Sequence, residues 1–420
     1  MVVENPQIMY LDTMGCPENR FDVAQLEGTL AKMGIRVTRN LKEADTIVLN
    51  TCGLTEGMEQ ICMEMLKKLQ GEASPGAQIL VTGCLPIIHG EVLKDFEDVR
   101  IIRGPLIESF PWETPFERGM VFNPALFPQR VLYNNDTFPR FDKGILWNLD
   151  RLMYKYIGIC PPGTDRCFIK VASGCNRFCT FCAVRISRGS LKSRQIEWVI
   201  DRFKRGIDAG YRDFSLIGTN VSAYGQDIGI SLPVLLRKIL EFKEPYTLNL
   251  RNLEPEDIIS YLPEYLEILK SGRIRYMEFP LESGSDRILK LMNRSYTVDE
   301  YVHALRLIKQ TMPGIFIRSR VMIGFPTETE EDFQASVRYA AELPFVFVEP
   351  FCFSPRPGTA AARLEGQISP REARRRLKVL HTRLMKSRLG YKLRVLSGCI
   401  GRQILCRSRG KGHSECRTLD

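Results

Sequence analysis

The stretch GCNRFCTFC, Gly174–Cys182, contains the tightest cysteine cluster of the chain. Its cysteines have the spacing C-x3-C-x2-C, which suits three irons of a cubane [4Fe–4S] cluster. The fourth iron then lacks a protein ligand, and an open metal position is typical of a site that does chemistry. Such an iron can chelate the amino and carboxylate groups of S-adenosylmethionine (SAM), whose reductive cleavage gives a 5′-deoxyadenosyl radical. We therefore expect Cys175, Cys179 and Cys182 to be metal ligands and catalytic residues.

A repeating strand and helix pattern continues from this stretch. Apolar runs typical of buried strands occur at 168–172, 214–218, 247–251, 275–279, 316–325 and 345–351. Helical segments lie between them, including 195–209, 233–242, 298–309 and 331–343. Six such βα units predict a partial (β/α)6 barrel over residues 166–365. In barrels of this kind, function gathers on the loops that follow the carboxyl ends of the strands.

The first 105 residues show a second α/β pattern. Strands are expected at 8–11, 46–50 and 79–83, with helical segments at 23–33 and 58–69 between them. This alternation predicts a doubly wound parallel sheet, which forms a separate N-terminal domain over residues 1–105.

One cysteine follows each of these three strands: Cys16, Cys52 and Cys84. Because the carboxyl ends of parallel strands meet at one edge of a sheet, we expect the three thiols to converge there. Turn residues flank each cysteine, in GCPEN, NTCGL and TGCLP. We interpret the trio as a second metal site with three thiolate ligands. The alternative is three buried structural cysteines, because free cysteine is often buried.

The composition agrees with thiolate ligation. The 420 residues include 13 cysteines but only four histidines, and the first residues lack the pattern of a secretory signal. No apolar run is long enough to span a bilayer. We therefore expect a cytoplasmic protein without a membrane partner, in which cysteines bind metal rather than form disulfides.

The excess positive charge lies at the end of the chain. Residues 366–420 hold 15 lysines and arginines against three acidic residues, and the whole chain carries +10. The segment begins as a basic amphipathic helix with Ser369 as a plausible N-cap. This charge predicts a polyanionic partner, with nucleic acid as the first candidate, and a solvated helix face is the alternative. Residues 106–165 are interpreted as a connecting segment.

These features resemble the radical SAM superfamily and, within it, the methylthiotransferase family. Further motifs match in order and spacing between Ile8 and about Leu389: RGSLKSR (188–194), IGTNVSAYGQD (217–227), LRNLEPEDI (250–258), PLESGSDRILKLMNRSYT (280–297), MIGFPTETEEDF (322–333) and SPRPGTAAA (354–362). The resemblance implies an enzyme that inserts a methylthio group at an unactivated C–H bond. It also implies two [4Fe–4S] clusters, one SAM as methyl donor and another as radical source. A low-potential electron donor such as flavodoxin or ferredoxin and a sulfur donor follow from this chemistry.

The resemblance also implies cofactor contacts outside the cysteines. The aromatic residue before the third cysteine, here Phe181, commonly packs near the adenine in that superfamily. Arg251 and Glu282, at the ends of later strands, are expected to contact the carboxylate or ribose of SAM. One strand-end segment is expected to hold its methionine amine or ribose: Gly218, Thr219 and Asn220. The alternatives are core packing for Phe181 and ordinary polar loop roles for the others.

Family members modify either adenosine 37 of certain transfer RNAs or an aspartate of a ribosomal protein. LRNLEPEDI is closest to the branch that acts at C2 of threonylcarbamoyl-adenosine in tRNA, so this is the expected target. Residues 399–420 resemble only the beginning of the family's terminal RNA-binding β-barrel, the TRAM domain. Glu282 replaces the usual glutamine, and Ser319–Arg320 replaces Thr-Asp. Two alternatives stay open: methylthiolation of a ribosomal protein or peptide, and a non-catalytic RNA-binding iron–sulfur protein.

Overall fold

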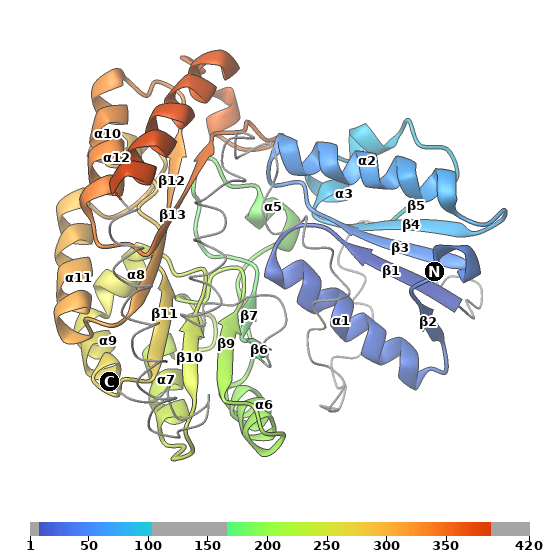
Figure 1. The fold of residues 1–420 in the computed structure, drawn as a ribbon, viewed down its shortest axis with the longest axis horizontal. Helices are drawn as coiled ribbons and strands as arrows, with labels where there is room; N and C mark the ends of the chain where they lie inside the picture. Colours follow the sequence, from blue (N-terminus) through green and yellow to red (C-terminus); the bar gives the residue numbers. More distant parts are fainter. Residues whose placement is uncertain (1–7, 103–165, 388–420) are drawn as a thin grey trace, which may run out of the picture.

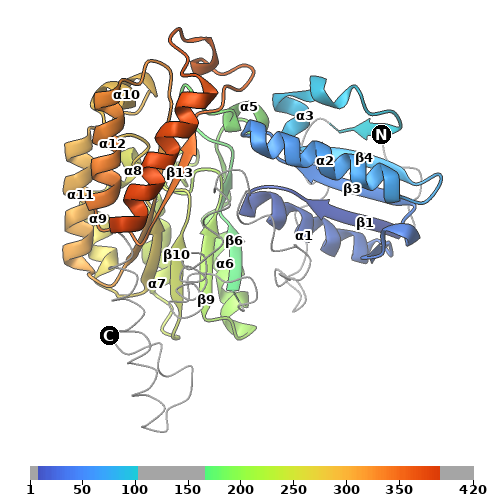
Figure 2. The same ribbon diagram turned by 45° about the horizontal axis from the view of Figure 1, so that its top comes forward.

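The computed structural model describes residues 8–102 and 166–387. The predicted connecting segment 106–165 and the TRAM-like residues 399–420 lie outside the described residues. Two parallel sheets, each covered by helices, lie side by side (Figures 1 and 2). No helix within the described ranges is long and apolar enough to cross a membrane.

The N-terminal sheet has five parallel strands in the order β2-β1-β3-β4-β5. Their bounds are β1 (Ile8–Thr13), β2 (Arg36–Thr38), β3 (Thr46–Thr51), β4 (Gln78–Gly83) and β5 (Val99–Ile101). The helices are α1 (Pro17–Lys32), α2 (Glu56–Glu72) and α3 (Leu85–Ile88), with short 3-10 turns at Leu41–Glu43 and Gly90–Leu93.

Helices α1 and α2 cover opposite faces of this sheet (Figure 1). Because side chains alternate along a strand, Val48 of β3 packs in the cluster that contains α1 residues. Ile47 and Leu49 pack in the cluster that contains α2 residues. All of β3 is buried, as a central strand covered on both faces should be. The predicted doubly wound sheet is confirmed.

The second sheet has six parallel strands in the order β13-β12-β11-β10-β9-β6. Their bounds are β6 (Arg166–Lys170), β9 (Asp213–Ile217), β10 (Thr247–Leu250), β11 (Ile274–Glu278), β12 (Phe316–Ile323) and β13 (Phe347–Cys352). The helices are α5 (Val184–Arg188), α6 (Ile196–Asp208), α7 (Leu232–Leu240), α8 (Pro255–Ser260), α9 (Leu262–Leu269), α10 (Asp286–Leu291), α11 (Val298–Thr311) and α12 (Glu330–Glu342), followed by a 3-10 turn at Ala361–Arg363 and a helix over 370–387. A small antiparallel pair joins β7 (Ala172–Ser173) to β8 (Lys192–Ser193).

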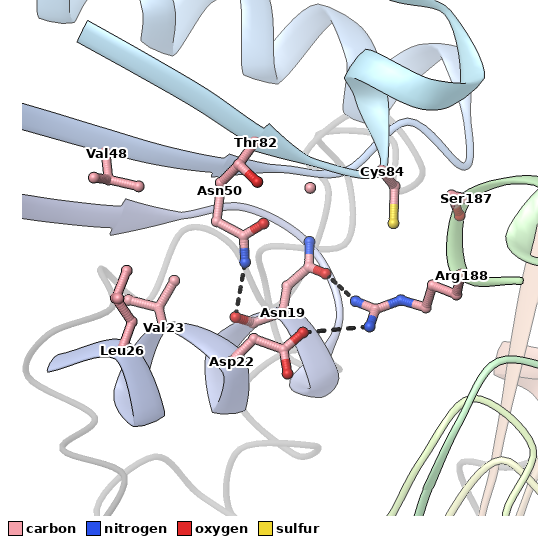
Figure 3. A pocket seen from close by; sticks show the side chains of 11 residues that line it. Asn19, Asp22, Val23, Leu26, Val48, Asn50, Thr82, Cys84, Ser187 and Arg188 are labelled. Carbon is pink, nitrogen blue, oxygen red and sulfur yellow. Dashed lines mark hydrogen bonds and ion pairs between the residues drawn. The ribbon is translucent and has the colours of Figure 1, made fainter. Parts of the chain in front are cut away.

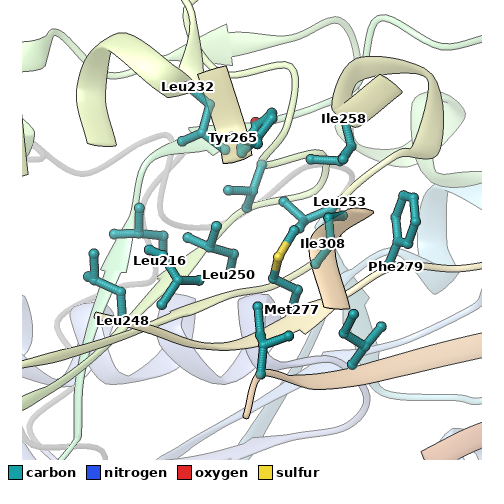
Figure 4. Packing of buried hydrophobic residues seen from close by; sticks show 14 of the residues in the cluster. Leu216, Leu232, Leu248, Leu250, Leu253, Ile258, Tyr265, Met277, Phe279 and Ile308 are labelled. Carbon is teal, nitrogen blue, oxygen red and sulfur yellow. The ribbon is translucent and has the colours of Figure 1, made fainter. Parts of the chain in front are cut away.

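The main core fills the space between this open barrel sheet and its helices. Figure 4 shows Leu248 and Leu250 of β10 packed with Ile258 of α8 and Ile308 of α11, all 1% exposed or less. The opposite, inner face of the sheet carries charged side chains instead. This arrangement confirms the predicted partial barrel and leaves its interior free for polar chemistry.

Candidate functional site

The loop that carries Cys175, Cys179 and Cys182 follows β6 and β7. Gly174 has φ +71°, and a Cβ there would lie 2.0 Å from the Ser190 carbonyl oxygen, so only glycine fits this position. The Arg185 guanidinium donates a hydrogen bond to the Cys175 carbonyl at 2.7 Å. The backbone of the loop is therefore fixed where its first cysteine begins.

The three loop cysteines are free and partly buried. Burial raises the pKa of each thiol, that of Cys182 to about 11. The thiols are close enough to interact electrostatically, since Cys175 raises the pKa of Cys182 and Cys182 raises that of Cys179. Iron would replace these protons, because the thiolate is the form that binds metal.

A buried arginine lies beside this loop. The Arg294 side chain is 2% exposed, pairs with Glu254, and lies 3.1 Å from Glu282. Its guanidinium carbon is 5.6 Å from the centre of the Phe181 ring. Burial raises the pKa of Glu254, and Arg294 partly offsets that rise. Arg294 also interacts electrostatically with Cys179, so this network extends to the cysteine loop.

Glu282 has an uncommon backbone conformation for a residue with a Cβ, with φ +60°. Its amide donates to the Arg320 carbonyl at 3.0 Å, and its carbonyl accepts from the Met322 amide at 2.8 Å. These bonds hold it against β12. Its Oε1 binds Arg294, whereas its buried Oε2 has no hydrogen-bond donor within the described ranges. One carboxylate oxygen therefore stays available inside the barrel.

Three more predicted cofactor contacts lie at strand ends near the loop. A Cβ at Gly218, just after β9, would lie 2.7 Å from the backbone of β7, so this close approach requires glycine. Asn220 places its side-chain nitrogen 3.8 Å from the Cys175 sulfur. Arg251, just after β10, pairs with Glu278 at 3.4 Å. Asn220 thus borders the cysteine loop, while Arg251 has a carboxylate partner.

The structure brings the three N-terminal cysteines to one edge of their sheet. Cys16 is the N-cap of α1, Cys52 follows β3, and Cys84 immediately precedes α3. A Cβ at Gly15 would lie 2.5 Å from the Cys52 Cβ. Burial raises the pKa of Cys52 well above its usual value, and the nearby thiols of Cys84 and Cys16 raise it further.

A fourth cysteine, Cys62, lies against this triad. It is on α2 and 1% exposed, and its sulfur is 3.4 Å from both the amide nitrogen and the carbonyl oxygen of Cys52. This contact was not predicted, because Cys52 and Cys62 are 10 residues apart and lie on different elements, the end of β3 and helix α2. Cys62 helps to fix the backbone of Cys52.

Buried ion pairs join the two sheets. Lys170 of β6 lies 2.7 Å from Asp22 and 3.3 Å from Glu18, both on α1. Arg188 of α5 lies 3.1 Å from Glu18 and 3.3 Å from Asp22. All four side chains are less than 10% exposed. The Thr219 hydroxyl donates to Glu18 at 2.9 Å, so this residue also joins the two units.

Arg188 also borders the N-terminal cysteines. Figure 3 shows its guanidinium reaching Asn19 and Asp22 at a small cavity, with Cys84 beside it on the same side. The cavity of about 20 Å³ has room for one water-sized molecule. Cys84 packs with Ala183, the residue that directly follows Cys182. The two cysteine triads therefore flank the same interface.

Each triad consists of cysteines, whose thiolates are the usual ligands of iron–sulfur clusters. In the part of the chain that the structure describes, no three His, Cys, Asp or Glu side chains are arranged to hold one metal ion. A cubane is bound differently, because each thiolate binds its own iron. The unpaired Glu282 oxygen suits SAM, whose ammonium and ribose hydroxyls donate hydrogen bonds.

Comparisons with known proteins agree with this arrangement. Residues 169–340 match the Radical SAM superfamily, and residues 8–104 match the group described as Uncharacterized protein family UPF0004. The fold is similar to that of the radical SAM methyltransferase TsrM from Kitasatospora setae, with a TM-score of 0.56, 16% identity, and coverage of 84% of this chain and 77% of that chain. The chain therefore has the radical SAM fold.

Three relatives of known activity narrow the class. The tRNA-2-methylthio-N(6)-dimethylallyladenosine synthase of Aquifex aeolicus is 31% identical to this chain. The aligned region covers 86% of this chain and 79% of that protein. Threonylcarbamoyladenosine tRNA methylthiotransferase MtaB of the same organism is 28% identical, and the alignment covers 88% of this chain and 86% of that protein. Ribosomal protein uS12 methylthiotransferase RimO of a Thermotoga species is 29% identical, and the alignment covers 92% of this chain and 87% of that protein.

The chain belongs to the radical SAM methylthiotransferase family. It is thus an enzyme, and its cofactors are SAM and [4Fe–4S] clusters. The relatives act on tRNA or on a ribosomal protein, so membership fixes the reaction more closely than the substrate.

Proposed function

We propose that this enzyme adds a methylthio group at C2 of N6-threonylcarbamoyl-adenosine 37 in tRNA. The observation that carries the methylthio transfer is the pair of cysteine triads on one interface, joined through the contact of Cys84 with Ala183. Cys175, Cys179 and Cys182 hold one cluster, and Cys16, Cys52 and Cys84 hold the other. A low-potential flavodoxin or ferredoxin supplies electrons, and a separate donor supplies sulfur.

When bound, the clusters and two SAM molecules supply the radical that removes hydrogen and the methylated sulfur that replaces it. The residues of the chain position these groups. Glu282 accepts a hydrogen bond from SAM through its unpaired oxygen, and Asn220 borders the cysteine that begins the loop. Phe181 packs beside the adenine, and Arg251 and Gly218 complete the cofactor contacts. The buried pairs of Lys170 and Arg188 fix one triad relative to the other.

The basic helix over 370–387 supports an RNA substrate. Arg371, Arg374 and Lys378 are exposed on it, at the spacing that places them on one face. Arg376, by contrast, is buried and lies 2.8 Å from Glu328, so it serves the fold. The exposed cations can contact phosphates without reading sequence.

Analysis of tRNA nucleosides tests the proposal. Mass spectrometry of bulk tRNA from cells with and without the gene should show loss of the 2-methylthio derivative of threonylcarbamoyl-adenosine in the deletion strain. Unchanged levels of every methylthioadenosine would refute a tRNA substrate.

A ribosomal protein is the second candidate, because the RimO relative covers 92% of this chain. In this case the deletion would leave tRNA unchanged, and a ribosomal protein aspartate would lose one methylthio group. The non-catalytic alternative is disfavoured, because the relatives in all three groups are enzymes.

Iron analysis tests the two-cluster assignment separately. Anaerobically reconstituted protein should contain about eight irons per chain, as two cubanes require. Cys179→Ala should abolish SAM cleavage, and Cys52→Ala should abolish methylthio transfer while SAM cleavage continues. A Cys179→Ala protein that still cleaved SAM would contradict the assignment.

A further inference from the structure

The inner face of the barrel sheet carries several arginines with carboxylate partners. Ile317, Ser319 and Val321 of β12 are buried, and two of them belong to the core under the helices. The alternate residues of this strand therefore point into the barrel. Arg318, one of them, lies 2.6 Å from Glu349.

The other inward arginines of the site are paired in the same way. Arg251 pairs with Glu278, Arg294 pairs with Glu254 and Glu282, and Arg318 pairs with Glu278 and Glu349. Buried and half-buried guanidinium groups usually find such acceptors, because unsatisfied donors cost free energy.

Arg320 is the exception among the inward arginines that the structure describes. It is half-buried, and its guanidinium makes no hydrogen bond and no ion pair within 4.0 Å in residues 8–102 and 166–387. Glu282, Glu278 and Glu349 interact with it electrostatically from a longer distance. If Arg320 served only to neutralise Glu282, the two would be paired, but Glu282 pairs with Arg294.

The position of Arg320 directs it toward the reaction site. The Arg320 carbonyl accepts a hydrogen bond from the Glu282 amide at 3.0 Å. Arg320 is therefore the direct neighbour of the residue whose free carboxylate oxygen faces the cofactor site. Met322, two residues further on the same face, packs in the cluster that includes Phe181. Arg320 also interacts with Glu254, which in turn interacts with all three loop cysteines.

We propose that Arg320 binds a substrate carboxylate inside the barrel and so selects an adenosine with an acidic N6 substituent over one with a neutral substituent. A guanidinium with free donors favours a planar anion, which it can bind with two parallel hydrogen bonds. Threonylcarbamoyl carries a carboxylate, whereas dimethylallyl carries none. The inference rests on the proposed function and deepens it, because it names the group of the substrate that is recognised.

Binding of defined RNAs tests the inference. Anticodon stem-loops with threonylcarbamoyl-adenosine, dimethylallyl-adenosine or adenosine at position 37 would be titrated against the reconstituted holoenzyme by fluorescence anisotropy. We expect the wild type to prefer the acidic nucleoside. Arg320→Gln should lower that preference roughly tenfold or more, as loss of a charged hydrogen bond predicts, and leave the other two affinities unchanged. Arg320→Lys should retain part of the preference, because it keeps the charge but not the paired donors.

Arg306→Gln is the matched control, because Arg306 is exposed on α11 and its loss removes the same charge. It should leave the preference among the three RNAs intact. The thermal midpoint of Arg320→Gln should fall only slightly, because no described ion pair is lost and only the longer-range attraction to three carboxylates is removed. An unchanged preference in Arg320→Gln would overturn the inference.

SAM is the other possible source of a carboxylate, and its binding is measured separately by equilibrium dialysis. Weaker SAM binding by Arg320→Gln, with equal effects on all three RNAs, would assign Arg320 to the cofactor and overturn the inference. A wild type that methylthiolates tRNA without any preference for the acidic nucleoside also refutes it, although the tRNA activity stands. A wild type that modifies no tRNA and instead modifies a ribosomal aspartate refutes the proposed function itself.

Discussion

At the residue scale, Gly174 is the position where one added carbon has the clearest consequence. Gly174→Ala would place a Cβ 2.0 Å from a backbone oxygen at a left-handed φ, so the backbone before Cys175 must move. We expect a loss of at least about 2 kcal/mol in unfolding free energy and of about four irons per chain, the content of one cluster. Urea unfolding and iron analysis measure the two effects.

Gly71→Ala is the control for this substitution. Gly71 lies within α2 and has open space around it, so alanine should stabilise the protein by up to about 1 kcal/mol. Full iron content in Gly174→Ala would show that the loop tolerates the added carbon.

Glu278 gives a prediction about pH. Burial alone would raise its pKa, but Arg251 and Arg318 outweigh burial and lower the pKa from 4.5 to about 2. The folded pKa is below the unfolded one, so ionised Glu278 stabilises the fold above pH 4.5 and loses that effect as pH falls toward 2. Glu278→Gln should cost about 3 kcal/mol at pH 7 and progressively less below pH 4.5.

Urea unfolding of wild type and Glu278→Gln at several pH values measures this difference. Glu267→Gln is the control, because its ion pair with Lys270 is exposed and should contribute less than about 1 kcal/mol. A constant difference between wild type and Glu278→Gln from pH 7 to pH 3 would contradict the assigned pKa.

At the scale of elements, sequence patterns located every long strand in the part of the chain that the structure describes. The three strands predicted in the first domain and the six predicted in the barrel are present, with ends within two residues of those expected. The edge strands β2 and β5 were missed, because each has only three residues, too few to show a periodic pattern. The β7–β8 pair was missed because its pairing joins residues about 20 apart, which periodicity does not detect.

The helix over 370–387 also carries a prediction about RNA binding. Arg374→Gln combined with Lys378→Gln should lower the slope of log affinity against log salt by roughly two, one for each lost phosphate contact. Anisotropy with a tRNA at several salt concentrations measures the slope. Arg375→Gln should change it less, because Arg375 already lies 2.8 Å from Glu372. An unchanged slope in the double variant would exclude this helix from the RNA interface.

At the scale of the whole molecule, the sequence predicted which cysteines lie together but not the buried ion pairs that join the two sheets. The ends of parallel strands placed Cys16, Cys52 and Cys84 together because sheet topology alone requires it. The pairing of Lys170 with Asp22 depends instead on how two separate sheets dock, and 148 positions separate these residues. The same limit applies to the hydrogen bond from Thr219 to Glu18, which also joins the two units.

This docking gives the last prediction. Lys170→Met keeps the size of the side chain but removes one of the cations that Glu18 and Asp22 pair with, so the contact between the sheets should weaken by about 3–5 kcal/mol. The loop cysteines are untouched, so SAM cleavage should continue. Methylthio transfer should fall much further, because it needs both triads in one fixed arrangement. The ratio of 5′-deoxyadenosine to methylthio product, measured by mass spectrometry, should therefore rise.

Lys204→Met is the matched control, since Lys204 is exposed on α6 and should leave that ratio unchanged. Iron content separates the two ways in which Lys170→Met can lose product. About eight irons with a raised ratio would mean that both clusters are present but poorly placed. An unchanged ratio with full iron would mean that the buried pairs between the sheets do not position the triads, and the proposed role of Lys170 would be wrong.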